Sequence, residues 1–384
     1  MSRTTVKLSA RDYNNTASTA SNFIGSGSIS PTNLNSQAQS SSNRNLIING
    51  DMTISQRGSS WTTASGYGDY TVDRWMTGHT VTGKFSSAWV EDAPTGFKYS
   101  WKATSASAYS VGAGEEFIVR QKIEGSNCAH LALGSASAKT VTLSFWVKSS
   151  LTGTFTGAFL NSAENRCYIF TYAISSAATW EKKEVTVALD TSGTWLTTNG
   201  IGLTLYFSLG AGANLVGTAG SWAGAKDLTV SGAVNFVGTG SATWQITGVQ
   251  LEVGSTSTDF ELEPFETTLA KCQRYFCRTY AYGTATGAAD TSHGAVMNSI
   301  EGSQTYASAG NFNFPVEMRA APTVTLYRTY NASTTGKVTA DATDGTGSIF
   351  GIASSRCFII RNDDNSGTGA NVFMRAHAIA AAEL

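Results

Sequence analysis

The amino-acid sequence predicts an all-β fold whose main body is a sandwich of two antiparallel sheets. Three segments, 141–148, 185–189 and 201–209, alternate apolar with other residues in strict order. A period of two with one apolar face is typical of half-buried antiparallel strands. The composition agrees, because charged residues make up only 14% of the chain and its 39 glycines suit tight turns. We therefore expect one body of two packed sheets over residues 46–262.

The closing strand of this body is expected at 244–254, WQITGVQLEVG. Its apolar residues change parity at Gly248; they are Trp244 and Ile246 before it, and Val249, Leu251 and Val253 after it. A β-bulge adds one extra residue to a strand, so the apolar residues before and after it can point to the same side of the sheet. The sequence therefore predicts a bulge at Gly248 that keeps both sets toward the core.

Residues 263–276 change to helical spacing. Pro264 suits a first helical turn, and apolar residues then recur at Phe265, Leu269, Cys272 and Phe276. This predicts a linker helix of about three turns. Residues 277–384 return to strand patterns and predict a second, small β-sandwich or knob as a C-terminal tip domain, with long polar loops at 284–294 and 331–348.

Residues 1–45 are rich in Ser, Asn, Thr and Gln and cannot bury enough apolar surface to fold alone. The few apolar side chains that could anchor this segment on another protein are Val6, Leu8, Tyr13, Phe23 and Ile24. The segment is interpreted as an extended N-terminal attachment arm, and a plain flexible tail is the alternative.

Four motifs occur together over roughly residues 46–280, the first of them beginning at Asn45: NLIINGDMTISQRG, TVDRW, ITGVQLEVGSTSTDFE and ETTLAKCQRYF. In combination they resemble tail fibre and appendage proteins of tailed bacteriophages. The opening NLIxNGD with a closing I-x-x-V-x-L-E strand also resembles the carbohydrate-binding-module jelly rolls of bacterial glycosidases. The resemblance implies a jelly roll whose first and last strands lie together.

The same resemblance implies a virion appendage, made in the host cytoplasm and located on the tail or another external structure. A homotrimer, attachment to virion tail or neck proteins through residues 1–45, and binding of a host cell-surface glycan are its further implications. The net charge of −1 without a basic run excludes a nucleic-acid footprint, and no apolar stretch is long enough for membrane insertion. No signal peptide is visible, and the five scattered cysteines are expected as small buried residues.

No catalytic residues are expected. The four histidines form no HExxH motif, and GxSxG and P-loop motifs are absent from the sequence. The carboxylates Glu261, Glu263 and Glu266 lie beside the expected helix start, where acidic side chains favour the helix dipole. A depolymerase built as a parallel β-helix would need a periodic ladder, which the chain lacks. The prediction is a binding protein without a cofactor.

A metal site is not expected either. The carbohydrate-binding modules that this chain resembles typically have a carboxylate just after NGD and another within the last strand, and these carboxylates hold Ca²⁺. This chain has Met52 and Thr53 at the first place and Thr247 and Gly248 at the second, and only Asp51 remains. Whether backbone carbonyls hold an ion is left open.

Planar aromatic rings are the sequence's candidates for sugar binding. Trp146 and Tyr206 interrupt the polar parity of two strands, so each is expected on a sheet surface opposite the core. If the strands share a sheet, the two rings form one platform with Lys148, joined by Tyr168 and Tyr172 if Ile169 faces inward. The alternative is that this surface packs against a sister subunit, where aromatic residues are also enriched.

A second candidate is the loop 61–70, WTTASGYGDY, with the rings of Trp61, Tyr67 and Tyr70. Three other functions stay open: a purely structural neck fibre, head fibre or tail adaptor; a secreted carbohydrate module; and a depolymerase. The sequence does not identify the host, the glycan, the position on the virion or the domain that contacts the receptor.

Overall fold

The computed structural model describes residues 44–62, 66–289, 295–300, 307–329, 335–340, 343–349, 353–363 and 372–384. Residues Asn45–Leu384 form one compact unit. The expected attachment arm, with Val6, Leu8, Tyr13, Phe23 and Ile24, lies outside the described residues. The predicted boundaries between the domains stay predictions.

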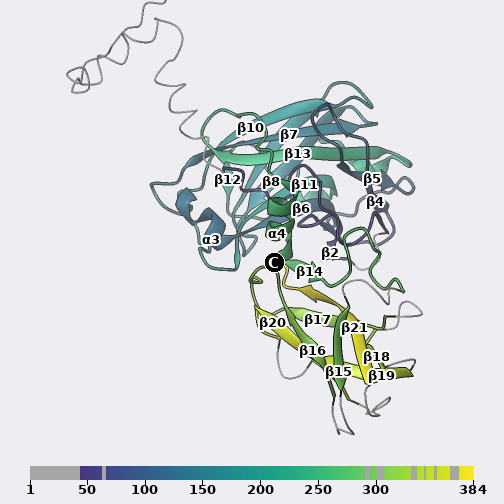
Figure 1. Cartoon of the computed structure of the whole chain (residues 1–384). Helices are drawn as coiled ribbons and strands as arrows, with labels where there is room; N and C mark the ends of the chain where they lie inside the picture. Colours follow the sequence, from purple (N-terminus) through teal and green to yellow (C-terminus); the bar gives the residue numbers. More distant parts are fainter. Residues whose placement is uncertain are drawn as a thin grey trace, which may run out of the picture. The chain divides into compact units, whose positions relative to one another are not determined.

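Two sheets form the main body, and neighbouring strands within each are antiparallel (Figure 1). The six-stranded sheet has the order β1 (Ser60–Thr62), β4 (Phe85–Val90), β5 (Ser100–Ser105), β13 (Thr243–Val253), β7 (Thr140–Ser149) and β10 (Glu181–Ala188). The seven-stranded sheet has the order β12 (Trp222–Ala223), β9 (Cys167–Ile174), β8 (Gly153–Leu160), β11 (Ile201–Ala211), β6 (Glu116–Glu124), β3 (Met76–His79) and β2 (Asp69–Tyr70). The predicted antiparallel jelly-roll sandwich is confirmed.

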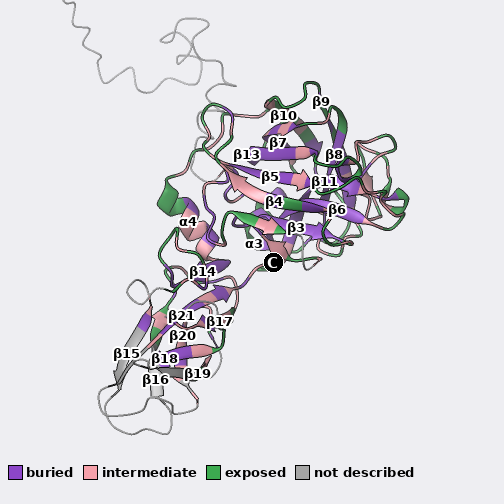
Figure 2. Ribbon diagram, turned by 90° about the vertical axis from the view of Figure 1, so that its right-hand side faces the viewer, coloured by how far each residue is buried: buried purple, intermediate pink, exposed green. Residues whose placement is uncertain are grey.

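The core lies between these sheets, where alternate residues of each strand meet (Figure 2). Its centre is aromatic: Trp101 and Trp244 cross edge to face with ring centroids 6.0 Å apart, and Phe207 lies 5.8 Å from Trp244. Large rings bury much apolar area for few ordered torsions, so a chain poor in charge and rich in glycine still forms a dense core.

The bulge in the closing strand is confirmed. Thr247 pairs with Trp146, but the next partners are Gln250 and Ser144, and Gly248 has a φ of 60°. Both apolar sets face inward as expected, since Trp244, Ile246, Val249 and Leu251 are fully buried. Val253 differs from the prediction, because it is the last residue of β13 and is 37% exposed.

The first residues of the body run beside this closing strand. The N–H of Leu46 donates to the carbonyl of Leu251 at 2.9 Å, and the N–H of Val249 donates to the carbonyl of Gly50 at 2.9 Å. The side chain of Asn45 accepts from Leu251 N–H and donates to the carbonyl of Val249. The two ends of the segment therefore close the sandwich together, as the opening and closing motifs predict.

The linker helix α4 spans Phe265–Gln273, so Phe276 belongs to the next strand and not to the helix. A four-residue helix, α3 (Gly125–Cys128), was not predicted. Single 3₁₀ turns occur at Ala129–Leu131, Ala213–Leu215 and Phe236–Gly238. Four of the five cysteines are buried and all are free, as expected; Cys357 is only half-buried.

The remaining strands build a third sheet in the order β14 (Phe276–Arg278), β21 (Val372–Ala381), β18 (Lys337–Ala340), β19 (Thr343–Ile349), β20 (Cys357–Asn362) and β16 (Ala307–Asn313). Strands β15 (Val296–Ile300) and β17 (Thr323–Tyr327) also pair with β21. A second hydrophobic core, separate from the first, includes Phe314, Phe358 and Ile360. This is the small β-rich tip that the sequence predicts.

Candidate functional site

A hollow of about 640 Å³ opens beside β1 and β2, and we call it the β1–β2 hollow. Its lining consists of Arg57, Ser60, Trp61, Thr62, Gly68, Asp69, Tyr70, Phe276, Ala381 and Glu383. The second aromatic candidate of the sequence, the loop 61–70, therefore supplies half of the lining residues. Residues 63–65 of that loop lie outside the described residues.

The hollow lies where both sheets end, since β1 is the last strand of one sheet and β2 the last strand of the other. Among the described strands, each of the two has a sheet neighbour on one side only. Trp61 is half-buried and packs against the sandwich core, which fixes the ring. The site therefore combines a rigid aromatic side chain with hydroxyls and carboxylates.

The opposite wall comes from residues more than 200 positions later. The guanidinium of Arg57 stacks on Phe276 at 3.7 Å and lies 5.3 Å from the ring centroid of Tyr70. The same guanidinium donates to the carboxylate of Glu383 at 2.8 Å. Arg57 thus joins the jelly-roll wall of the hollow to the wall that the C-terminal strands supply.

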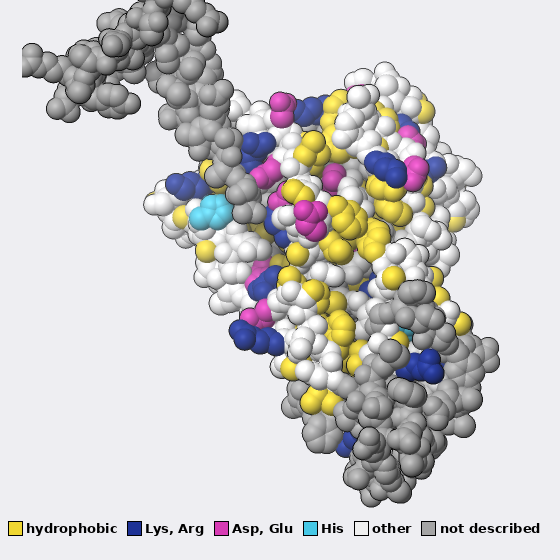
Figure 3. Space-filling model, in the orientation of Figure 1, with side chains coloured by type: hydrophobic (Ala, Val, Ile, Leu, Met, Phe, Trp, Pro, Cys, Tyr) yellow, Lys and Arg dark blue, Asp and Glu magenta, His cyan; other side chains and the backbone are white. Residues whose placement is uncertain are grey.

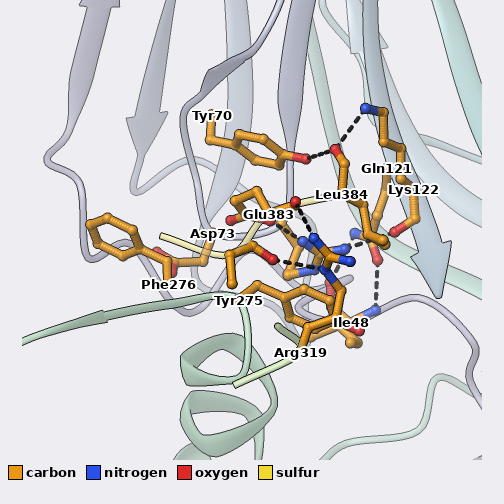
Figure 4. A network of polar contacts seen from close by, with 12 residues as sticks. Ile48, Tyr70, Asp73, Gln121, Lys122, Tyr275, Phe276, Arg319, Glu383 and Leu384 are labelled. Carbon is orange, nitrogen blue, oxygen red and sulfur yellow. Dashed lines mark hydrogen bonds and ion pairs between the residues drawn. The ribbon is translucent and has the colours of Figure 1, made fainter. Parts of the chain in front are cut away.

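A buried polar cluster lies under this wall (Figure 4). Asp73 is 1% exposed and accepts from the backbone N–H of Gln56 at 2.6 Å and from its side-chain amide at 2.7 Å. Burial raises the pKa of Asp73 despite the nearby charge of Arg57. Arg74, also 1% exposed, pairs with Glu383 and stacks on Tyr275 at 3.5 Å.

This cluster explains three motifs that the sequence presented only as a resemblance. SQRG supplies Gln56 and Arg57, DRW supplies Asp73 and Arg74, and CQRYF supplies Tyr275 and Phe276. In the sequence these charged residues suggest solvent exposure, and nothing local to them indicates that they meet. The only signal that could have found the cluster is the adjacent carboxylate and arginine of DRW, with a second arginine 16 residues earlier in SQRG.

Tyr70 is half-buried, and its hydroxyl donates to the backbone oxygen of Leu384 at 2.9 Å. Burial, with a smaller contribution from Glu383, raises the pKa of Tyr70 to about 12. The phenol therefore stays protonated and keeps donating at neutral pH. Its ring remains part of the hollow lining.

The predicted platform of Trp146 and Tyr206 is wrong. Trp146 and Lys148 belong to β7 in the six-stranded sheet, whereas Tyr206 belongs to β11 in the seven-stranded sheet. Tyr206 does point away from the main core, but it is 1% exposed because Leu228 and other residues of the 212–237 region cover that face.

The hydroxyl of Tyr206 accepts from Arg120 at 2.6 Å and donates to Glu164 at 2.7 Å, so its polar end is also occupied. On the other sheet, Lys148 pairs with Asp92 at 2.5 Å and lies 5.0 Å over the ring of Trp180. Trp146 is half-buried and adjoins the bulge at Gly248.

Tyr168 and Tyr172 were expected to join the platform only if Ile169 faced inward, but the residues of β9 alternate the other way. Ile169 faces away from the main core and Tyr172 faces into it, 5% exposed and stacked with Phe155 at 5.8 Å. Tyr168 is half-buried with its ring 5.4 Å from Trp222. Tyr172 is therefore a core residue and not a sugar-binding residue.

Tyr67 is 46% exposed, but it does not line the hollow. Its hydroxyl hydrogen-bonds Glu116, and Lys226 bridges Glu116 and Glu164 at 3.1 and 2.9 Å. Burial and the bond to Glu116 raise the pKa of Tyr67. Of the two tyrosines of the loop 61–70, Tyr67 therefore contacts a network of paired charges, and Tyr70 lines the hollow.

Two of the carboxylates near α4 have structural partners. Glu261 accepts from the backbone N–H of Asn45 at 2.8 Å, and Glu263 pairs with Lys271. Within the described ranges, no three or more His, Cys, Asp or Glu side chains gather in a way that could hold a metal. No helix in the described part of the chain is long and apolar enough to cross a membrane.

Comparison with protein-family models and with curated proteins gives no match. Among solved structures, the enzymatically active domain of bacteriophage CBA120 tailspike protein 4 is similar with 13% identity and a TM-score of 0.31, over 55% of this chain and 22% of that one. A putative sugar binding protein from Bacteroides thetaiotaomicron is similar with 12% identity and a TM-score of 0.32, over 55% of this chain and 100% of that one.

A family 11 carbohydrate-binding module from Clostridium thermocellum is similar with 10% identity and a TM-score of 0.27, over 52% of this chain and 98% of that one. This chain spans less than a quarter of the tailspike domain's length. At these identities and TM-scores the similarities carry no conclusion about activity or ligand.

Proposed function

We propose that this protein is a virion appendage of a tailed bacteriophage that binds a host surface glycan in the β1–β2 hollow. The observation that carries the glycan proposal is the hollow itself, whose lining holds Trp61 and Tyr70 beside hydroxyls and carboxylates at the ends of both sheets. Pyranose C–H groups pack on aromatic rings while polar neighbours hydrogen-bond the sugar hydroxyls. The assignment to a virion rests on the motif resemblance, together with attachment through residues 1–45 and a homotrimer.

The charges of the hollow favour a neutral glycan over an acidic one. Arg57 is the cation among the lining residues, and it is engaged by Glu383 at 2.8 Å and lies 3.6 Å from Asp73. The lining also contains the carboxylates of Asp69 and Glu383. A sugar carboxylate would meet like charge there, whereas neutral hydroxyls can donate to those oxygens.

A protein that only binds its glycan can use a low-affinity site, provided that many copies of the site act together. A single shallow sugar contact is weak, but copies on several subunits and several appendages raise the overall affinity through effective concentration. The protein is accordingly proposed to bind its glycan without cleaving it. Turnover of a purified host polysaccharide by the full chain would contradict this.

The test is an array of bacterial surface polysaccharides, neutral and acidic, probed with the full chain and two variants. Trp61→Ala removes the ring that lines the hollow and should lower the affinity about fivefold, since an aromatic contact contributes about 1 kcal/mol. Trp180→Ala removes a half-buried ring outside the hollow and should bind like the wild type. Equal binding by Trp61→Ala would refute the site.

The second candidate is a purely structural role as a neck fibre, head fibre or tail adaptor. Exposed apolar side chains near α4 favour it, because Leu262 is 70% exposed and Phe265 and Tyr282 are each 43% exposed. Hydrophobic side chains are also visible across the middle of one face (Figure 3). Such surface suits contact with other virion proteins. Absence of binding to every array glycan and to host cells would favour this role.

A further inference from the structure

We propose that Tyr67, Glu164 and Lys226 form a second sugar subsite beside the β1–β2 hollow, so that the ligand of this protein is a chain of neutral sugar units rather than a single terminal sugar. The inference rests on the proposed glycan function and deepens it, because it assigns the kind of glycan. We call these three residues the Tyr67 subsite.

The first observation is that the structure fixes the ring of Tyr67 while leaving it at the surface. Tyr67 is 46% exposed, and its hydroxyl hydrogen-bonds the carboxylate of Glu116, which is 2% exposed. A Cβ at Gly78 of β3 would lie 3.1 Å from Cδ1 of Tyr67, so the ring packs where the sheet has no side chain. The polar end of Tyr67 is held inside, and ring carbons face solvent. A ring fixed in advance loses little freedom when a sugar stacks on it.

Charged side chains surround this ring in balanced pairs. The guanidinium of Arg120 lies 5.8 Å from the ring centroid, and the ammonium of Lys226 lies 5.9 Å from it. Lys226 contacts Glu116 at 3.1 Å and Glu164 at 2.9 Å, and Arg120 contacts Glu164 at 3.2 Å. The two cations and the two carboxylates cancel, so the surroundings of the ring suit a neutral sugar.

Two of these charged groups keep hydrogen-bonding capacity for a ligand. The ammonium of Lys226 has three N–H donors, and within the described part of the chain it contacts two carboxylates. The carboxylate of Glu164 has about four acceptor positions, of which Arg120, Tyr206 and Lys226 occupy three. The side chains of Lys226 and Glu164 are 29% and 34% exposed, so both can be reached from solvent. A sugar stacked on Tyr67 can therefore accept from one and donate to the other.

The backbone of Glu164 is a second, independent observation. This residue lies in the turn between β8 and β9 and has a φ of 51°, in the left-handed region that residues other than glycine uncommonly adopt. Such conformations persist only where the surrounding structure holds them, and they cluster at binding and active sites. Here the turn places the carboxylate of Glu164 against Lys226 and Arg120.

The position of Tyr67 beside the hollow indicates that one ligand can occupy both. Gly68, Asp69 and Tyr70 line the hollow, and Tyr67 is the residue directly before Gly68. Consecutive Cα atoms are about 3.8 Å apart, so the subsite begins at the rim of the hollow. A sugar chain that leaves the hollow past Gly68 meets the ring of Tyr67 next. A single sugar enclosed in the hollow does not contact it, because Tyr67 is not one of the lining residues.

The experiment uses the full chain, the array polysaccharide that the wild type binds best, and short fragments of that polysaccharide made by partial acid hydrolysis. Tyr67→Leu removes the ring but keeps an apolar side chain over Gly78. Tyr67→Phe keeps the ring and removes only the hydroxyl. Tyr99→Leu is the matched control, because Tyr99 is a half-buried tyrosine outside the hollow whose ring also has a cation nearby, the ammonium of Lys98 at 4.8 Å.

Tyr67→Leu is expected to bind the polysaccharide about fivefold more weakly, which corresponds to about 1 kcal/mol for one aromatic contact. Tyr67→Phe and Tyr99→Leu should bind it like the wild type. The shortest fragments should bind the wild type and Tyr67→Leu equally, because they occupy the hollow alone. A purely structural role of Tyr67 would lower the urea midpoints of both Tyr67 variants and change the affinity of neither.

A footprinting measurement on the wild type needs no variant, and it decides if Tyr67→Leu does not fold. Hydroxyl radicals oxidise exposed tyrosine rings. The bound polysaccharide should protect Tyr67 but not Tyr282, which is 43% exposed and lies outside the hollow. The shortest fragments should protect neither ring. Oxidation of Tyr67 that is the same with and without polysaccharide would overturn the proposal.

The binding results separate this inference from the proposed function. If Tyr67→Leu binds the polysaccharide like the wild type while Trp61→Ala binds it more weakly, the subsite is refuted and the hollow remains. If Tyr67→Leu binds more weakly while Trp61→Ala is unaffected, the hollow is refuted and the sugar site at Tyr67 is supported. Equal affinity of the wild type for the shortest fragments and for the polysaccharide would contradict a sugar chain as the ligand.

Discussion

Substituting Gly50 with alanine tests the closure of the sandwich at its tightest point. A Cβ at this position would lie 2.0 Å from the carbonyl oxygen of Val249 and 3.1 Å from its carbonyl carbon. Both atoms belong to the backbone of the closing strand, so no side-chain rotation relieves the contact. The glycine of the NGD motif is therefore required by the close approach of two backbones.

The cost follows from what must move. Residues 45–50 have to shift away from β13, which strains or breaks the 2.9 Å hydrogen bond from Val249 to Gly50. One backbone hydrogen bond contributes about 1 kcal/mol. Overpacking strain in a dense region costs about 1–3 kcal/mol. We expect Gly50→Ala to lower the free energy of unfolding by about 2–4 kcal/mol.

Urea denaturation followed by tryptophan fluorescence measures this loss, because several tryptophans are buried in the same core. Gly220→Ala is the control: Gly220 has a φ of 87°, but a Cβ there meets nothing within 4 Å. Only backbone strain of about 1 kcal/mol applies to the control. Equal losses in the two variants, or a Gly50→Ala midpoint at the wild-type value, would refute the steric argument.

Three further predictions concern titration, reactivity and the buried tyrosine. Burial lowers the pKa of Lys122 from 10.5 to about 8, so the unfolded state binds more protons than the folded state between those pH values. The stability of the wild type relative to Lys122→Met should therefore rise from pH 8 to 10.5. A difference in urea midpoints that stays constant over this range would contradict the prediction. Iodoacetamide should label Cys357 in the folded protein but should label the buried cysteines only in denaturant. The reason is that burial raises the pKa of Cys128 and of Cys277 to about 12, which keeps these thiols protonated. Labelled Cys128 or Cys277 in mass spectra of native samples would count against this prediction. Tyr206→Phe loses two hydrogen bonds to charged groups and should lower the free energy of unfolding by about 1–3 kcal/mol. Glycan binding should stay unchanged. Weakened binding to the array would show that the outer face of β11 takes part in glycan binding.

Local pattern was sufficient where each strand's own residues decide the outcome. The change of parity at Gly248 predicted the bulge because side chains alternate along any strand, whatever lies beside it. The spacing of apolar residues after Pro264 predicted α4 for the same kind of reason, although the helix ends at Gln273, before the last residue of the pattern. The opening and closing motifs predicted two ends that meet, and the hydrogen bond from Leu46 to Leu251 confirms it.

Strand order and coverage are decided by partners far away in the chain, and here the sequence fell short. Alternation placed Tyr206 on an outer face correctly, but it carried no information that β7 and β11 belong to different sheets or that Leu228 would cover the ring. For β9, where apolar and aromatic residues occupy both parities, alternation did not reveal which face Ile169 and Tyr172 would take.

The sequence by itself determined that this chain forms an antiparallel sandwich closed by its own first and last segments, because period-two alternation and a parity change are properties of single strands. Only the tertiary structure decided where the hollow that we propose as a ligand site lies. The β1–β2 hollow exists because the last described strands of both sheets lie beside Phe276 and Glu383 from the distant end of the chain. The arginines and carboxylate beneath it are stable in the interior only when paired, and those pairs span up to 326 residues of sequence.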